Sequence, residues 1–198
     1  MRRLAIAGVM VTLLGLGAGP ATAPAQTVDP DQAAMMQAWI DSMTPGPEHA
    51  GLATRVGTWT VSSTMWPSPG ADPMVSHGTA ERVMINDGRA LEETFTGEME
   101  GQTFHGRATT GYDNVTEQYW STWIDTMSTS IAVFYGDYDE GKGAWVMEGE
   151  TADPMTGDMI DMRIEIREDG PDREIEDFYM PGPDGELFKT MELVYERQ

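Results

Sequence analysis

Two charged side chains stand among apolar ones in segments whose residues alternate as in β-strands. Glu93 shares a strand face with Leu91 and Phe95. Lys189 shares a face with four large hydrophobic or aromatic residues close to the C-terminus. A charge that faces a protein interior is costly unless it is paired or hydrated. The pattern therefore predicts either a buried Glu93–Lys189 ion pair or two polar anchors for a ligand in an apolar cavity, unless a local bulge turns one side chain outward.

Aromatic residues on the central expected strands are a second group that could contact a ligand. Trp120, Trp123 and Trp145 fall on neighbouring strands there. Because successive side chains of a strand face opposite sides, Trp120 and Trp123 cannot both face inward without a bulge. We predict that Trp123 faces inward, with Tyr119 on the same face. The candidate ligand-binding residues are thus Glu93, Tyr119, Trp123 and Lys189.

The sequence contains no pattern typical of a catalytic or metal centre. No histidine has a second one at a metal-ligand spacing, and His77 and His105 lie on different expected strands. An acidic run at 137–141 departs from the EF-hand pattern at its fifth position. With no cysteine, the chain has neither disulfides nor a thiolate nucleophile. We assign no catalytic residue, metal or cofactor, and an envelope enzyme that uses a buried carboxylate such as Glu93 or Asp125 stays an alternative.

The charge balance argues against one class of partner. The 198-residue chain has 12 Lys and Arg against 33 Asp and Glu, which gives a formal net charge of -21. A nucleic-acid-binding protein neutralises phosphates with clustered basic residues, so we expect no nucleic-acid partner. A small apolar molecule is the partner that the sequence favours.

The N-terminus has the three parts of a secretory signal. Arg2 and Arg3 precede the uncharged, mostly apolar segment 4–19, and Ala-Pro-Ala at 23–25 supplies a cleavage pattern. The apolar segment is shorter than the about 20 residues of a membrane-spanning helix, which disfavours the alternative of a retained anchor. We therefore predict a signal peptide at 1–25, export to the periplasm or the exterior of a bacterium, and no stable membrane insertion after cleavage.

The hydrophobic pattern predicts about ten strands that would position these residues. Before them, a helix is expected at 31–43, with a stripe of Met, Trp and Ile that should pack as core or as a lid, and a short helical segment runs from 47 to about 55. From residue 57 onward the pattern has period two. The expected strands are 57–65, 74–85, 89–97, 103–111, 117–125, 131–137, 144–151, 159–168, 173–180 and 186–196.

Short connections indicate how these strands pair. Parallel neighbours need crossovers of about a dozen residues or more, so tight turns predict an antiparallel meander. An open sheet of this size would leave two exposed edges, and closure into a barrel removes them. We predict an all-β barrel that either fills with side chains or encloses one small ligand, with a two-sheet sandwich as the alternative.

The tripeptide Gly57-Thr58-Trp59, which opens the first expected strand, resembles the first motif of the lipocalin and calycin barrels. In those families the tryptophan plugs the closed end of the barrel, and an arginine near the last strand packs over it. The resemblance implies a structural role for Trp59, covered by Arg197 through a cation–π contact.

Six motifs in order along the chain carry a more specific resemblance. They are PGPEH at 45–49, VGTW at 56–59, TGYDN at 110–114, STWID at 121–125, DPMTG at 153–157 and GPDG at 182–185. Over about 44–197 the chain resembles the bacterial family DUF1579, a domain of unknown function. This implies a calycin-like barrel at 57–198, after a leader with short helices at 26–56, and it implies no activity or catalytic residue. The chain also resembles, more distantly, the nitrobindin-like haem barrels. Those barrels place a haem-ligating histidine near the C-terminal end, whereas no histidine follows His105 in this chain, which argues against haem.

Together these features favour an exported, non-enzymatic barrel that binds a small apolar or amphipathic ligand. Abundant methionine supports this, because its flexible thioether side chain adapts to an irregular ligand surface. The alternatives are a packed structural or interaction barrel without a ligand, and the envelope enzyme named above.

Overall fold

The computed structural model describes residues 29–99 and 101–198, which form two helices followed by ten β-strands. The helices are α1 (Pro30–Met43) and α2 (Pro47–Ala53). The strands are β1 (Gly57–Met65), β2 (Met74–Ile85), β3 (Ala90–Met99), β4 (Gln102–Asp113), β5 (Gln118–Asp125), β6 (Ala132–Asp139), β7 (Ala144–Ala152), β8 (Met159–Glu168), β9 (Arg173–Pro181) and β10 (Leu187–Arg197). Every predicted strand is present, with its ends shifted by two residues at most. The predicted signal peptide at 1–25 lies outside the described residues.

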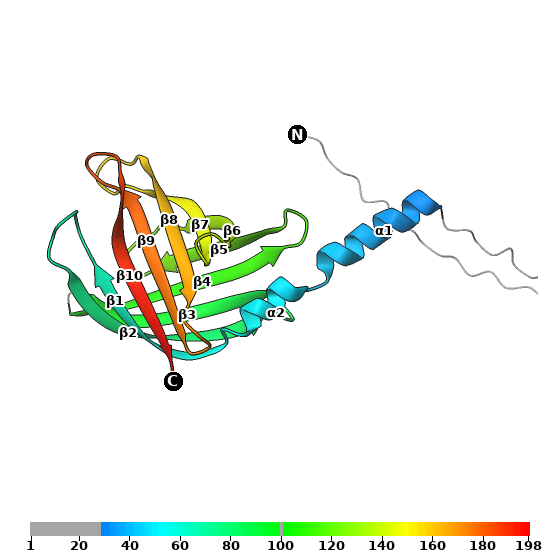
Figure 1. Ribbon diagram of the computed structural model, residues 1–198, viewed down its shortest axis with the longest axis horizontal. Coiled ribbons are helices and arrows are strands. Elements are labelled where there is room, and N and C mark those ends of the chain that lie inside the picture. Colours follow the sequence, from blue (N-terminus) through cyan, green and yellow to red (C-terminus); the bar gives the residue numbers. More distant parts are fainter. Residues whose placement is uncertain (1–28, 100) are drawn as a thin grey trace, which may run out of the picture.

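The strands close into one antiparallel barrel (Figure 1). Each strand pairs with its neighbours in sequence, and β1 also pairs with β10, from Trp59 opposite Arg197 to Met65 opposite Met191. This pairing joins the two strands that would otherwise be the edges of the sheet. The prediction of a closed meander is therefore confirmed, and the alternative of a two-sheet sandwich is wrong.

Alternation along each strand places one row of side chains inside the barrel. Trp59 and Tyr195 are the largest members of one buried cluster, formed by β1, β2 and β10. Phe134 and Met147 belong to a second cluster on β6, β7 and β8, on the opposite side of the strand order. The hydrophobic core therefore consists of two separate clusters, one on each side of the barrel wall, and they do not join in the centre of the barrel.

Helix α2 packs against β2, β3 and β4 at one end of the barrel. Its buried side chains are His49 and Leu52. Pro47 occupies the first turn, where its missing N–H costs nothing, and Nδ1 of His49 accepts a hydrogen bond from the backbone N–H of Gly46 at 3.0 Å. The helix is thus held in place at its start, and Leu52 reaches the barrel interior.

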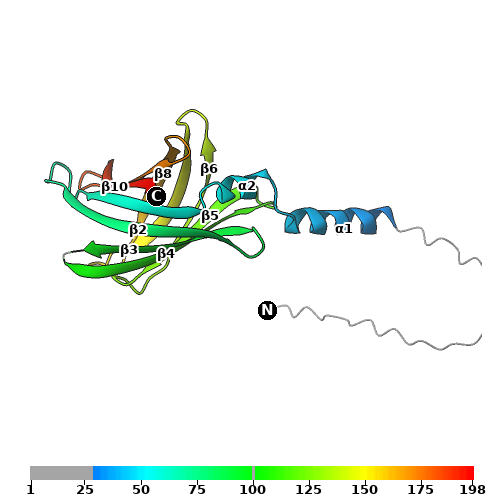
Figure 2. The same cartoon turned by 90° about the horizontal axis from the view of Figure 1, so that it is seen from below.

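Helix α1 does not pack on the barrel, so the prediction that its apolar stripe forms core or a lid is wrong. The side chains of the stripe are between 45% and 62% exposed. They are Met35, Met36, Trp39, Ile40 and Met43. Figures 1 and 2 show α1 projecting beyond α2 and away from the barrel. Along residues 29–99 and 101–198, no helix has the length and apolar character that crossing a membrane requires.

The C-terminal end of α1 is nevertheless attached to two turns of the barrel. Arg89 donates a hydrogen bond to the carbonyl of Met43 at 2.8 Å. Asn114 donates to the carbonyls of Asp41 and Thr44 at 2.9 and 2.8 Å. These bonds bring the last turn of α1 to the α2 end of the barrel, the end opposite the β5–β6 and β7–β8 connections.

Candidate ligand-binding cavity

A cavity of about 740 Å³ lies inside the barrel. Side chains from all ten strands and from α2 line it. Its volume falls within the range of about 300–1,000 Å³ typical of sites for one small molecule. The barrel is therefore large enough, and empty enough between its two core clusters, to enclose a ligand.

The walls of the cavity toward the β5–β6 connection are rich in apolar and aromatic side chains, and Glu98 and Asp125 are the charged residues among them. The rings of Phe95, Phe104 and Trp123 form a cluster with centroids 5.8–6.5 Å apart. The indole N–H of Trp123 donates to Asp125 at 2.7 Å, which fixes the ring. Five methionines lie among the lining residues on this side: Met65, Met99, Met127, Met162 and Met191. Such a surface suits the apolar part of a ligand.

The ring of Trp123 needs the bare backbone of Gly106 beneath it. A Cβ atom at Gly106 would lie 2.1 Å from Cη2 of the indole, far inside van der Waals contact. We therefore expect Gly106→Ala to displace Trp123 and to lower the free energy of unfolding by about 1–3 kcal/mol. Urea unfolding followed by tryptophan emission measures both effects. Gly51→Ala is the matched control, because a Cβ there meets nothing within 4 Å, and equal stability of the two variants would contradict the packing argument.

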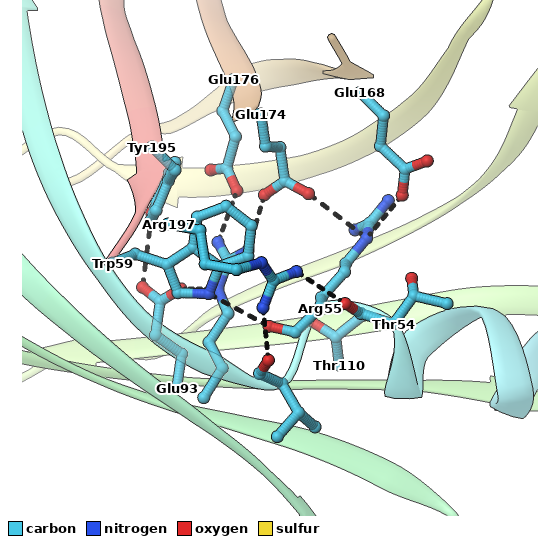
Figure 3. A network of polar contacts seen from close by, with 12 residues as sticks. Thr54, Arg55, Trp59, Glu93, Thr110, Glu168, Glu174, Glu176, Tyr195 and Arg197 are labelled. Atoms are coloured by element: carbon cyan, nitrogen blue, oxygen red, sulfur yellow. Dashed lines mark hydrogen bonds and ion pairs between the residues drawn. The ribbon is translucent and has the colours of Figure 1, made fainter. Parts of the chain in front are cut away.

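At the α2 end the cavity floor is ionic, and Arg82 is its centre. Figure 3 shows Glu93, Glu174, Glu176 and Tyr195 gathered at this floor. Only 4% of this arginine is exposed. Its Nε lies 2.5 Å from Glu93, its Nη1 lies 2.8 Å from Glu174, and its Nη2 lies 3.5 Å from Glu176. The Tyr195 hydroxyl donates to the second oxygen of Glu93 at 3.3 Å, and its ring lies 4.2 Å from the guanidinium carbon. A buried guanidinium is thus matched to carboxyl groups from two sides of the barrel.

Arg55, which follows α2, adds a second cation to this floor. Its Nε lies 3.2 Å from Glu174 and 3.3 Å from Glu168. Its guanidinium carbon lies 4.4 Å from the centre of the Trp145 ring, within cation–π range. The turn after α2 is itself held, because the indole N–H of Trp59 donates to the carbonyl of Arg55 at 3.1 Å.

Burial and neighbouring charges shift the pKa values of these groups in different directions. Burial, and then the nearby Glu174 carboxylate, raise the pKa of Glu176 well above its ordinary value. Burial also opposes the charge of Glu174, but Arg55 and Arg82 together lower its pKa. For Tyr195, burial and then the nearby Glu176 and Glu93 raise the pKa well above its usual range, so its hydroxyl stays a donor. One of the carboxyl groups at the floor, Glu176, therefore holds a proton that an exposed glutamate would lose.

The contact predicted between Trp59 and Arg197 is present at the same end. The Arg197 guanidinium carbon lies 4.1 Å from the centre of the Trp59 ring. Arg197 also donates to the carbonyls of Val56 and Thr54 at 2.6 and 2.8 Å. Trp59 is 2% exposed and does not line the cavity, which agrees with a structural plug at the closed end.

Three of the four candidate ligand-binding residues line the cavity. Glu93 is at the ionic floor, and Tyr119 and Trp123 share the inner face of β5 as the alternation predicts. Trp120 lies on the outer face, against Gly111 of β4. Contact of Glu93, Tyr119 and Trp123 with a ligand stays a prediction, but their positions allow it.

Lys189 does not line the cavity, and it does not pair with Glu93. The register of β10 against β9 shifts between Lys189 and Met191, which leaves Thr190 as an extra residue. This bulge turns Lys189 to the outer face, where its Nζ lies 3.0 Å from Asp177 and 2.6 Å from Glu192. The inward placement predicted for Lys189 is therefore wrong, because a local bulge turns this side chain outward.

The histidines are separate from one another. His77 and His105 lie on β2 and β4 and are 3.2 Å from the hydroxyls of Ser62 and Thr96 respectively. Within residues 29–99 and 101–198, no group of three or more His, Cys, Asp or Glu side chains is arranged to hold a metal ion.

Sequence reasoning missed Arg55, Arg82, Glu174 and Glu176. For Arg82 a signal existed, because the Asn86-Asp87-Gly88 turn sets the register that places Arg82 opposite Glu93. Glu174 and Glu176 carry a weaker signal, since they share a face with Phe178 in a segment rich in acidic residues on both faces. Arg55 lies in the turn before β1, and no periodicity there indicates that it reaches the interior.

A comparison with protein-family models decides the family of this chain. The model described as "Protein of unknown function (DUF1579)" matches residues 44–197. The chain belongs to this family. The matched part of this DUF1579 protein includes α2 and all ten strands, and therefore every residue of the ionic floor. No curated protein matches the chain.

Two solved structures share the barrel of this DUF1579 protein. Rv2717c from M. tuberculosis is 14% identical, with a TM-score of 0.55 over 78% of this chain and 99% of its own. The S-type phycobiliprotein lyase CPES from Guillardia theta is 10% identical, with a TM-score of 0.52 over 81% of this chain and 96% of its own. At these identities the likeness establishes the fold alone, a calycin-like barrel.

Proposed function

We propose that this protein is exported from a bacterial cell and binds one small apolar or amphipathic molecule inside its barrel, without transforming it. The observation that carries the proposal is the cavity of about 740 Å³ with a mainly apolar wall and an ionic floor. Binding sites for small molecules have this composition, in which apolar walls supply affinity and a few polar groups orient the ligand.

The alternative of a packed barrel without a ligand is less well supported. A packed interior leaves few voids larger than a water molecule, whereas this one has space for an organic molecule. The enzyme alternative has a candidate acid in Glu176, but the floor pairs its other charged groups with one another. Binding therefore accounts for the cavity with fewer assumptions than catalysis does.

Native mass spectrometry on protein purified from its own envelope without detergent tests the proposal. We expect a mass excess that disappears on denaturation, over a polypeptide that begins at Gln26. A polypeptide that begins at Met1 would contradict export processing. Bare protein that also fails to bind N-phenyl-1-naphthylamine, an uncharged apolar fluorophore, would contradict ligand binding.

Reducing the volume of the cavity should weaken binding. Ala108 faces the interior between Glu93 and Trp123, its partners on β3 and β5. We expect Ala108→Phe to weaken binding of N-phenyl-1-naphthylamine about tenfold or more, a loss of about 1.4 kcal/mol. Thr109→Phe adds a ring to the neighbouring outward position and is the matched control. Equal affinities of the two variants, measured by fluorescence titration, would show that the probe binds elsewhere.

A further inference from the structure

The inner floor of the cavity has one more carboxyl group than it has cations. Three carboxyl groups, those of Glu93, Glu174 and Glu176, surround the two guanidinium groups of Arg55 and Arg82. Glu168 at the rim, which also contacts Arg55, adds a further negative charge. In a low-dielectric interior such an excess is tolerated only if a proton or another cation balances it.

The floor is unsuited to a carboxylate head group. All three nitrogens of the Arg82 guanidinium already have a carboxyl partner. The rings of Tyr195 and Trp59 also lie over this guanidinium, at 4.2 and 5.3 Å from its carbon. An anionic ligand would therefore approach an arginine whose three nitrogens each already contact a carboxyl group, and it would face several carboxyl groups at close range.

Of the three carboxyl groups at the inner floor, that of Glu176 is least neutralised by an arginine and most accessible from the cavity. Its contact with Arg82, at 3.5 Å, is the longest of the three, and 15% of its side chain is exposed in the interior that it lines. The charged and titratable groups that face it are Arg82 of β2, Glu93 of β3, Glu174 of β9, Tyr195 of β10 and Arg55 after α2. Burial, Glu174 and Glu93 raise its pKa, so the free protein balances the excess charge by keeping a proton on Glu176.

We propose that the ligand is a cationic amphiphile, an amine whose ammonium group lies beside Glu176 and whose apolar part extends along the methionine and aromatic walls. This deepens the proposed function and rests on it. As the ammonium group binds, the Glu176 O–H bond breaks and its proton passes to the solvent, which leaves a carboxylate that accepts from the ammonium N–H. The inner floor then has three positive charges against three negative ones.

The test compares three molecules with the same ten-carbon chain: decylamine, 1-decanol and decanoate. Isothermal titration calorimetry at pH 7, below micelle-forming concentrations, gives each affinity. We expect decylamine to bind about tenfold or more tightly than 1-decanol, and decanoate to bind most weakly. Repeating the titration in buffers of different ionisation enthalpy should show proton release with decylamine and none with 1-decanol.

Glu176→Gln is the decisive variant, and Glu148→Gln, on the exposed face of β7, is its matched control. Glu176→Gln should lose the proton release and most of the preference for decylamine, while it keeps its affinity for 1-decanol. Glu148→Gln should behave as wild type. Decanoate binding as tightly as decylamine, or a preference for the amine that survives Glu176→Gln, would overturn this inference and leave the proposed function intact. Failure of all three molecules and of N-phenyl-1-naphthylamine to bind would overturn the proposed function itself.

Discussion

Replacement of Arg82 by methionine is expected to lower the free energy of unfolding by about 3–5 kcal/mol, because it leaves buried carboxylates without their cation. Burial opposes the charge of Arg82, but Glu174 and Glu93 hold its pKa well above the ordinary value, so it is fully charged in the folded protein. Methionine retains much of the volume but none of the charge. Urea unfolding at pH 7 measures the change.

Two further variants identify the cause of this loss. Arg107→Met removes an arginine that is 56% exposed on the outer face and 3.8 Å from Glu92, and we expect a change within about 0.5 kcal/mol. Adding Glu174→Gln to Arg82→Met should restore part of the lost stability, since one stranded carboxylate is gone. If Arg82→Met is as stable as Arg107→Met, the cluster does not contribute to the fold as described.

The barrel could be predicted from the sequence because local signals agree with one another along most of the chain. Period-two alternation marks each strand, and glycine-containing turns between them are too short for parallel crossovers. The turn at Asn86–Gly88 is an example, with positive φ at Asn86, Asp87 and Gly88 as a tight hairpin connection requires. Pairing of β1 with β10 was predicted because an open sheet would leave unpaired backbone groups at its two edge strands, and no single residue indicated it.

The site could be predicted only in part, because its members meet across the barrel. Glu93 was recognisable as a charge on an apolar face, but its partners on β2 and β10 are 11 and 102 residues away in the sequence. The prediction that Lys189 faces inward failed because one extra residue in β10, between Lys189 and Met191, reverses the alternation of side chains there. No turn residue in the sequence marks that bulge.

The apolar stripe of α1 shows a different limit of sequence reasoning. Helical spacing of Met35, Trp39 and Met43 correctly indicates a helix, yet periodicity does not say what its apolar face contacts. The Pro45-Gly46-Pro47 stop separates α1 from α2. Among the described residues, hydrogen bonds join only the last turn of α1 to the barrel. A core residue and an exposed apolar residue on a projecting helix have the same sequence signature.

Glu176→Gln is expected to make the protein more stable than wild type, by a margin that grows as the pH rises above about 5. In the unfolded chain Glu176 ionises around its ordinary pKa of 4.5, whereas burial and Glu174 keep it protonated in the fold. Between these two pKa values the folded protein binds more protons than the unfolded one, so wild-type stability falls with rising pH. Glutamine does not titrate, and its amide can still donate to Glu174.

The difference between variant and wild type should therefore rise by up to about 1.4 kcal/mol per pH unit over that window. Thermal or urea unfolding of both proteins at several pH values measures it. Glu174, whose pKa is lowered by the arginines, contributes a trend of opposite sign only below its ordinary pKa of 4.5, which lies outside this window. Glu148→Gln makes the same substitution on the exposed outer face of β7 and is the matched control. A Glu176→Gln difference that does not change with pH would mean that Glu176 is ionised in the folded protein, and the cavity floor would then keep its excess negative charge without a proton to balance it.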